Sequence, residues 1–196
     1  MVGWIKLRDN RVGFRKVCLA VLAVWVLLAS LMIPQQAAGQ TEKQAEWVAS
    51  VVSVQGLVQV RRQDAQHWQM VRLDDRFLAG DVINVGANSR AAFALKNEST
   101  LRVDQKTTIV FSAAEPQQPF LIELLKGAVH FFSRVHRSLR IVTPFVNGAV
   151  EGTEFVARVD ADKTTISLLE GRLRVSNPQG SILMTQNQSV SAAANQ

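Results

Sequence analysis

The sequence predicts an all-β protein, an antiparallel β-sandwich that follows an N-terminal apolar leader helix. From Trp47 onward, apolar residues alternate with polar or small residues, most clearly at 101–103, 166–168 and 173–175. Such period-two runs are typical of strands with one buried face. Glycine, asparagine and proline recur between the runs, as at 177–180. Short strands joined by frequent turns favour a sandwich or a barrel.

The first part of the chain has the order of a secretory signal peptide. Residues 1–16 are basic, residues 17–33 are apolar apart from one serine, and Pro34 ends the run. The small residues at 37–39 then fit a cleavage site. We therefore predict a signal peptide over residues 1–39.

An uncleaved membrane anchor stays open as an alternative, because the apolar run is near the lower length limit for a span. In both cases the basic flank remains in the cytoplasm and the rest of the chain is exported. We therefore expect the body to be periplasmic or exported, and to touch the membrane only through the N-terminal segment if that segment is uncleaved.

The remaining chain is expected to hold one domain. Residues 40–48 read as a linker, residues 49–190 as the β domain and residues 191–196 as a tail.

The charge of the chain is concentrated in its first part. Five basic residues and one acidic residue give residues 1–39 a charge of +4, out of +6 for the whole chain, so residues 40–196 carry +2. Binding to phosphates needs a concentrated basic surface, so no nucleic-acid partner is expected.

The single cysteine, Cys18, lies in the apolar segment. The residues after the predicted cleavage site therefore contain no cysteine. This excludes a disulfide, a thiolate zinc site and a cysteine nucleophile from the body.

A short pattern occurs three times, at Gly56, Gly127 and Gly171. In each copy a polar residue precedes the glycine, and alternating apolar positions follow it. Glycine tolerates a positive φ and close contacts that other residues do not. We therefore predict a bulge or a tight bend at each of the three positions.

The segment 143–155 has the pattern T-P-x5-V-x-G-T-x-F. Pro144 lacks an N–H group and is expected at the edge or start of a strand. Asn147-Gly148 is a favourable pair for a tight turn, and Gly152 allows two backbones to approach closely. The segment thus predicts a core hairpin.

The second strand of this hairpin is expected to alternate from Thr153 onward. The two predicted faces are Phe155, Ala157 and Val159 on one side, and Glu154, Val156 and Arg158 on the other.

The segment resembles the core motif of the FecR domain, an exported bacterial sensory module. Further pieces of the resemblance follow in the family's order and together cover roughly residues 50–176: Gly56 before a short strand, Trp68 before Gly80-Asp81, Gly86 before Ser89-Arg90-Ala91, a hairpin at 95–101, and the closing segment 169–175.

The resemblance implies a jelly-roll-like sandwich without catalytic activity or cofactor. In the family this domain lies outside the inner membrane of regulators of iron uptake. It receives a signal from an outer-membrane transporter and passes it inward to control a sigma factor. The implied partner is an envelope protein or an outer-membrane component. The implied motif residues, mainly structural, are Thr143, Pro144, Val150, Gly152, Thr153, Phe155, Gly80, Asp81 and Gly171.

Two features depart from the family's pattern. Only 16 residues precede the apolar run, which is too few for a cytoplasmic anti-sigma domain. We therefore expect an interaction module without sigma-factor output. The hairpin turn holds Asn97-Glu98 where the family commonly has Asp-Gly, and asparagine can still adopt the left-handed conformation.

Two groups of polar residues invite other hypotheses. Arg134, Arg137 and Arg140 could meet an acidic partner, a ligand carboxylate or membrane headgroups; the alternative is a solvated face. His130 and His136 would share a face if one strand ran through both, and could then bind a metal with Glu123 and Glu151. We expect two exposed histidines and no metal.

An enzyme is the least supported class. Glu151 and Glu154 have opposite parity on a strand and would point to different faces, unlike the paired carboxylates of a glycosidase. A carbohydrate- or cell-wall-binding module stays open, although the body offers only Trp47 and Trp68 as large indole surfaces.

Overall fold

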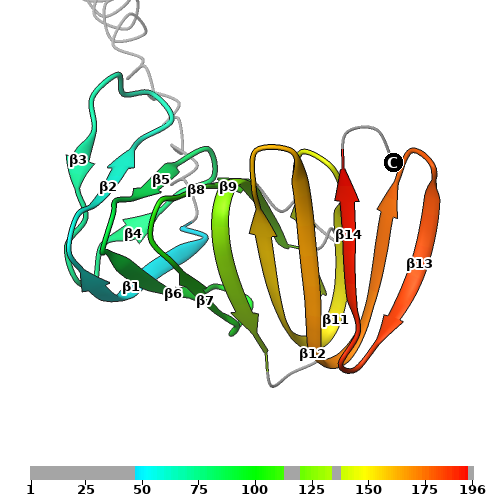
Figure 1. The fold of residues 1–196 in the computed structure, drawn as a ribbon. Helices are drawn as coiled ribbons and strands as arrows, with labels where there is room; N and C mark the ends of the chain where they lie inside the picture. The colour runs from blue at the N-terminus through cyan, green and yellow to red at the C-terminus, as the bar shows by residue number, and fades with distance from the viewer. Residues whose placement is uncertain (1–46, 113–119, 134–137, 194–196) are drawn as a thin grey trace, which may run out of the picture. The chain divides into compact units, whose positions relative to one another are not determined.

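The computed structural model describes residues 47–112, 120–133 and 138–193 (Figure 1). Of residues 138, 151 and 152 it describes the backbone alone. The chain divides into two compact units, 1–44 and 45–196, and the described residues belong to the second. The predicted signal peptide and most of the predicted linker therefore lie outside the described residues.

The described residues form fourteen strands and no helix, which confirms the predicted all-β class. The strands are β1 (Ala49–Gln55), β2 (Val58–Arg61), β3 (Gln69–Met70), β4 (Arg76–Phe77), β5 (Val82–Val85), β6 (Arg90–Leu95), β7 (Thr100–Val103), β8 (Thr107–Ser112), β9 (Phe120–Phe132), β10 (Ser138–Val142), β11 (Asn147–Val159), β12 (Lys163–Asn177), β13 (Gly180–Thr185) and β14 (Ser189–Ala193). Within these ranges there is accordingly no helix long and apolar enough to cross a membrane.

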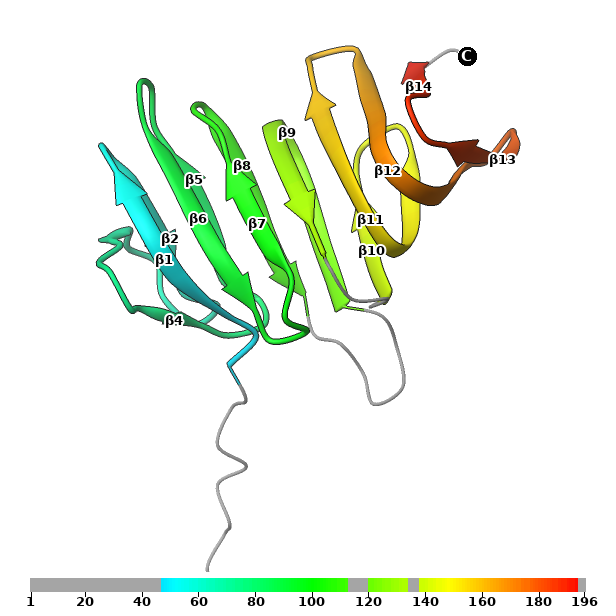
Figure 2. The ribbon, with the colours of Figure 1, turned by 90° about the horizontal axis from the view of Figure 1, so that it is seen from below.

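All fourteen strands join one hydrogen-bonded network with two arms that meet at β9. The first arm has the order β4-β1-β6-β7, and β7 pairs with residues 129–132 of β9. The second arm has the order β3-β2-β5-β8, and β8 pairs with residues 121–126 of β9. Figure 2 shows β1, β6 and β7 following one another toward β9.

The long strands β9, β11 and β12 run through both arms. Their halves at 127–132, 154–159 and 163–167 continue the first arm and end at β14. Their other halves pair with β8, β10 and β13 and continue the second arm. The two layers expected of a sandwich are therefore continuous with each other.

The expectation that all pairs are antiparallel is wrong for one pair. β9 and β10 run parallel, with Leu139 opposite Phe120 and Val142 opposite Glu123. Parallel neighbours need a connection that returns to the same end of the sheet, and this return is not visible in the local alternation of the sequence.

The predicted bends at the three glycines are confirmed. Gly56, Gly127 and Gly171 have φ values of 76°, 89° and 87°. Each lies where the chain leaves one arm for the other: between β1 and β2, within β9 and within β12. At Gly127 a Cβ atom would lie 2.6 Å from the Cα atom of Thr107, so a side chain does not fit there.

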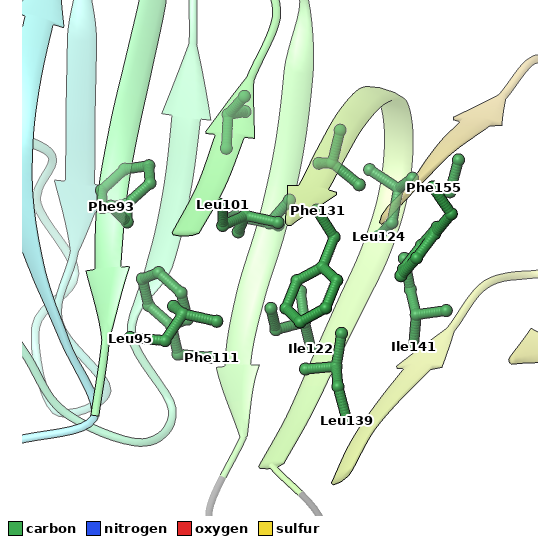
Figure 3. Packing of buried hydrophobic residues seen from close by; sticks show 14 of the residues in the cluster. Phe93, Leu95, Leu101, Phe111, Ile122, Leu124, Phe131, Leu139, Ile141 and Phe155 are labelled. Carbon is green, nitrogen blue, oxygen red and sulfur yellow. The ribbon is translucent and has the colours of Figure 1, made fainter. Parts of the chain in front are cut away.

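The core lies between the two arms and is rich in phenylalanine (Figure 3). Phe93 on the first arm and Phe111 on the second meet edge to face, with ring centroids 5.5 Å apart. Phe77 contacts both rings, at 5.4 and 5.7 Å. Nearer the C-terminus, Phe131 and Phe155 lie 5.3 Å apart on adjacent strands of the first arm.

Two turns differ from what their sequences suggest. β10 and β11 form the expected hairpin, but Asn147 and Gly148 already belong to β11, and Pro144 lies in the connecting turn instead of a strand. In the turn between β6 and β7 the left-handed residue is Glu98, with φ of 64°, and not Asn97.

Candidate functional site

Thr143 closes the turn between β10 and β11 with its side chain. Its hydroxyl donates to the carbonyl oxygen of Val146 at 2.5 Å and accepts from the N–H group of the same residue at 3.2 Å. A further bond of 3.0 Å joins it to the hydroxyl of the fully buried Thr164. The threonine therefore supplies turn geometry.

The following motif residues belong to the core and to the crossing of β11 between the arms. Val150 and Phe155 are buried. Gly152 lies where the pairing of β11 with β12 shifts register, between Glu151 and Glu154. Thr153 is buried as well, and its hydroxyl has no hydrogen-bond partner among the described residues.

Gly80 and Asp81 form a second buried turn. Gly80 has φ of 88° and donates its N–H group to the carbonyl oxygen of Phe111 at 2.6 Å. The carboxylate of Asp81, 1% exposed, accepts from Arg62 Nη1 at 2.6 Å and from the N–H group of Leu78 at 2.9 Å. The buried charge of Asp81 is thus paired with a partly exposed arginine and hydrogen-bonded to the backbone, which is an arrangement typical of a structural carboxylate.

His130 lies on the outer face of the first arm and pairs with Glu154 across two strands. Its Nε2 atom lies 2.7 Å from Glu154 Oε1, and both side chains are just over a quarter exposed. β9 ends at Phe132, so no single strand runs through His130 and His136, and His136 lies outside the described residues. Within the described part of the chain, no three metal-ligating side chains gather.

Of the two carboxylates considered for glycoside hydrolysis, Glu151 is described by its backbone alone. The register shift between Glu151 and Glu154 breaks the alternation, so strand parity does not carry across it, contrary to our reasoning from the sequence. Glu123 lies on the half of β9 that joins the second arm and accepts a hydrogen bond of 2.9 Å from Ser112. From Glu154 onward the predicted alternation is confirmed: Phe155, Ala157 and Val159 are buried, while Arg158 is exposed.

Of the predicted arginine cluster, Arg140 is exposed on β10, whereas Arg134 and Arg137 lie outside the described residues. Arg140 is opposite Leu121 on β9 and Ala149 on β11.

The most exposed apolar strand is β13, and it lies at the end of the second arm. Among the described residues β13 pairs with β12 alone. Its residues Gly-Ser-Ile-Leu-Met-Thr include no charged residue and no proline, and only Met184 is buried. Ile182 and Leu183 are 50% and 53% exposed. Because neighbouring residues of a strand point to opposite faces, apolar side chains are exposed on both sides of this edge.

An opening of about 350 Å³ lies beside this edge, between β13 and β14. Val146, Val175, Ile182 and Val190 line it. A partner strand that pairs with β13 could insert an apolar side chain there.

We did not predict this edge from the sequence, although a signal was present. Two adjacent apolar residues in an uncharged hexapeptide cannot both be buried in a strand with one buried face. The sequence did not indicate that β13 would be the terminal strand of its arm.

Comparisons with known proteins agree with the fold. Residues 81–174, from the residue before β5 into β12, match the family model described as FecR protein. Two crystal structures of a protein from Parabacteroides distasonis ATCC 8503, described as a "putative anti-sigma factor", are similar with a TM-score of 0.52 and 15% identity. The match covers 57% of this chain and 54% of that one, so it spans about half of the length of that protein. No curated protein matches the sequence of this chain.

Proposed function

We propose that the chain, which matches the FecR family over residues 81–174, is an exported, non-catalytic module that senses a signal by binding another protein of the cell envelope. Regulators of this kind act through contacts with other proteins, and the family match and the fold likeness to a protein described as an anti-sigma factor support such a role. Location in the periplasm and an outer-membrane component as the partner are part of this proposal. So is the jelly-roll-like description of the two arms.

The observation that carries the proposal is the open edge of β13. A strand at the end of a sheet presents unpaired N–H and C=O groups, and natural proteins usually protect long edges with charges, prolines or bulges. β13 has six residues and includes no charged residue or proline. We infer that an extended segment of the partner adds to β13, so that main-chain hydrogen bonds provide affinity and side-chain pockets provide specificity.

The residues of the sequence motif have a supporting role in this proposal. Thr143 and Asp81 hold turns, Phe155 fills the core, and Gly171 lets β12 cross from β14 to β13. The motif therefore positions the edge without contacting the partner.

Carbohydrate binding is less well supported. Sugar-binding sheets present several aromatic side chains on one face, and of the aromatic residues that the structure describes, Trp68 alone is exposed. Its ring is covered in part by Arg61, whose guanidinium carbon lies 5.6 Å from the ring centroid.

Site-specific photocrosslinking in intact cells tests the proposal. A photoreactive amino acid replaces Leu183 in one full-length variant and Leu73 in another. Leu73 serves as the matched control because it is 61% exposed but lies at the other end of the sheet. We expect one discrete adduct with an envelope protein from position 183 and none from position 73. Equal adducts from both positions, or none from position 183, would overturn the proposal.

A further inference from the structure

The first arm carries a second hollow, away from β13, which we name the corner groove. It consists of two adjoining cavities of about 600 and about 620 Å³. Both are lined by Asp104, Ala128 and Arg158, so they lie side by side. One cavity lies over the outer face of the first arm, and the other lies at the bends that follow β7 and interrupt β9.

The floor of the corner groove has small side chains set among longer ones. Ala92, Arg102, His130 and Val156 lie opposite one another on β6, β7, β9 and β11. In the next row Ala128 lies opposite Arg158. Short side chains between long basic ones leave a depression bordered by cations.

The walls of the groove hold an excess of positive charge. Five basic residues line it, against two acidic residues: Arg90, Arg102, Lys106, Lys126 and Arg158 against Asp104 and Asp160. The resulting charge of +3 exceeds the +2 carried by residues 40–196 together. The groove is therefore locally basic, although residues 40–196 as a whole are nearly neutral.

Most of these cations have no partner within the described part of the chain. Arg90 lies 3.4 Å from Asp104. No acidic side chain of the described ranges pairs with Arg102, Lys106, Lys126 or Arg158. Arg102 and Arg158 are on β7 and β11 with β9 between them, so their strands are about 10 Å apart. This spacing suits two carboxylates of an extended ligand.

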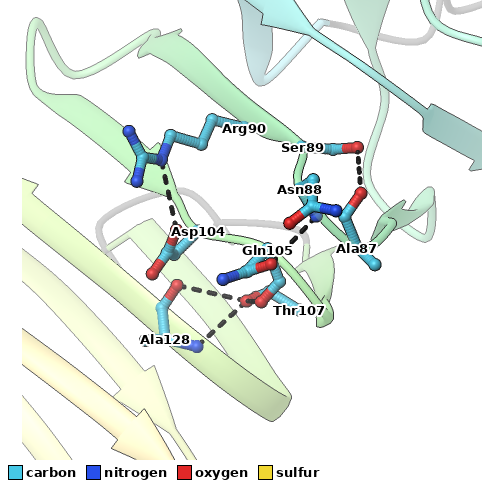
Figure 4. Close-up of polar contacts among 8 residues, drawn as sticks. All are labelled: Ala87, Asn88, Ser89, Arg90, Asp104, Gln105, Thr107 and Ala128. Carbon is cyan, nitrogen blue, oxygen red and sulfur yellow. Dashed lines mark hydrogen bonds and ion pairs between the residues drawn. The ribbon is translucent and has the colours of Figure 1, made fainter.

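A hydrogen-bond network fixes the corner (Figure 4). The N–H group of Asn88 donates to Gln105 Oε1 at 2.9 Å, which holds the turn after β7. The hydroxyl of Thr107 accepts from the N–H group of Ala128 at 3.0 Å, directly after the bend at Gly127. Because the backbone that carries the cations is already fixed, binding needs little ordering of the site.

Apolar residues lie at one end of the groove. Leu125 is 46% exposed, Pro144 is exposed and Phe145 is half-buried. A free phosphate has no group for such a surface, and a polysaccharide would stack on aromatic faces. A peptide can place an apolar side chain beside its carboxylates.

We propose that the corner groove binds an acidic peptide segment of a partner protein. Its carboxylates pair with Arg102 and Arg158, and an apolar side chain packs against Leu125, Pro144 and Phe145. The inference rests on the proposed function in that the partner is a protein, but it uses residues that are distinct from those of β13.

Fluorescence anisotropy with the full-length chain tests this binding. The probe is a fluorescein-labelled peptide of Glu-Glu-Leu repeats, and the control peptide has Gln in place of Glu. We expect the acidic peptide to bind, with an affinity that falls as salt is added, and the Gln peptide not to bind. The double substitution Arg102→Gln and Arg158→Gln should weaken binding by about fivefold or more.

A matched variant removes the same charge elsewhere. Arg172→Gln with Arg174→Gln changes two exposed arginines on the half of β12 that pairs with β13, and it should leave the affinity unchanged. Equal weakening by both double variants, or stronger competition by inorganic phosphate or polygalacturonate than by unlabelled peptide, would overturn the inference.

The two proposals can fail separately. Absence of peptide binding while the adduct from position 183 persists overturns only the groove. Peptide binding that is lost in the groove variant, without any adduct from position 183, supports the groove and overturns the role of β13.

Discussion

The edge strands at the two ends of the sheet differ in length and in the charges that lie near them. At the N-terminal end the terminal strands β3 and β4 have two residues each, which leaves little backbone to pair with another chain. Arginines also cover the aromatic rings nearby, with Arg76 over Trp47 at 5.5 Å and Arg61 over Trp68 at 5.6 Å. At the C-terminal end β13 has six uncharged residues, and all of them except Met184 are exposed.

The N-terminal end is also held by an aromatic cluster and a partly buried ion pair. Phe77, Phe93 and Phe111 form one cluster between the arms, and Asp81 joins Arg62 beside it. Short edge strands and nearby charges are devices by which natural proteins protect an edge from pairing. The N-terminal end therefore maintains the fold, whereas the C-terminal end has the edge at which we propose that a partner strand pairs.

The largest effect is expected from Phe93→Ala, which removes the centre of the N-terminal cluster. Phe93 is fully buried and contacts two other rings. The substitution leaves a cavity that the paired strands cannot close. It should lower the free energy of unfolding by about 3–5 kcal/mol, as measured by denaturant unfolding.

The matched change at the other end is Ile182→Ala. Ile182 is 50% exposed, so its truncation should cost less than about 0.5 kcal/mol. If Phe93→Ala and Ile182→Ala lower the free energy of unfolding equally, the two ends do not differ in their contribution to stability and the comparison is wrong.

The sequence predicted the features that depend on a few neighbouring residues. A positive φ is a local property, and the recurring polar-glycine pattern located three of the bends where the chain changes arms, at Gly56, Gly127 and Gly171. Alternation after Thr153 likewise placed Phe155 in the core and Arg158 outside. We predicted the turn at Asn147-Gly148, but the chain turns before these residues, around Pro144. The hydroxyl of Thr143 closes this turn by hydrogen bonds to Val146, and that side-chain contact was not predicted.

Features that depend on strand order could not be predicted in this way. Arg102 and Arg158 lie 56 positions apart in the sequence, and they border one groove only because β7 and β11 both pair with β9. The parallel pair of β9 and β10 and the terminal place of β13 are of the same kind. Alternation shows which face a residue occupies, but not which strand lies beside it.

A smaller difference in stability is expected between alanine substitutions of two glycines, one at each end of the sheet. Gly56 joins β1 and β2 with φ of 76°, and a Cβ atom there would lie 3.1 Å from the Cα atom of Ser89. Gly56→Ala should cost about 2 kcal/mol, from the left-handed backbone and the close contact together. Gly180→Ala, at the start of β13, meets no atom within 4 Å and should cost close to nothing. Thermal melting of both variants measures the two losses of stability. An equal loss in both would show that the backbone at the start of β13 is as constrained as that at Gly56.

The smallest effect on stability is expected from Leu183→Lys. Leu183 is 53% exposed, so a lysine should change the free energy of unfolding by less than about 0.5 kcal/mol. A charge on an open edge opposes pairing with another strand, so the variant should fold normally and still lose the crosslinked partner when the photoreactive amino acid is placed at Ile182. Leu73→Lys, at the protected end, should keep the partner. A loss above about 1 kcal/mol in Leu183→Lys would mean that this side chain is packed in the folded protein and therefore does not mark a free edge.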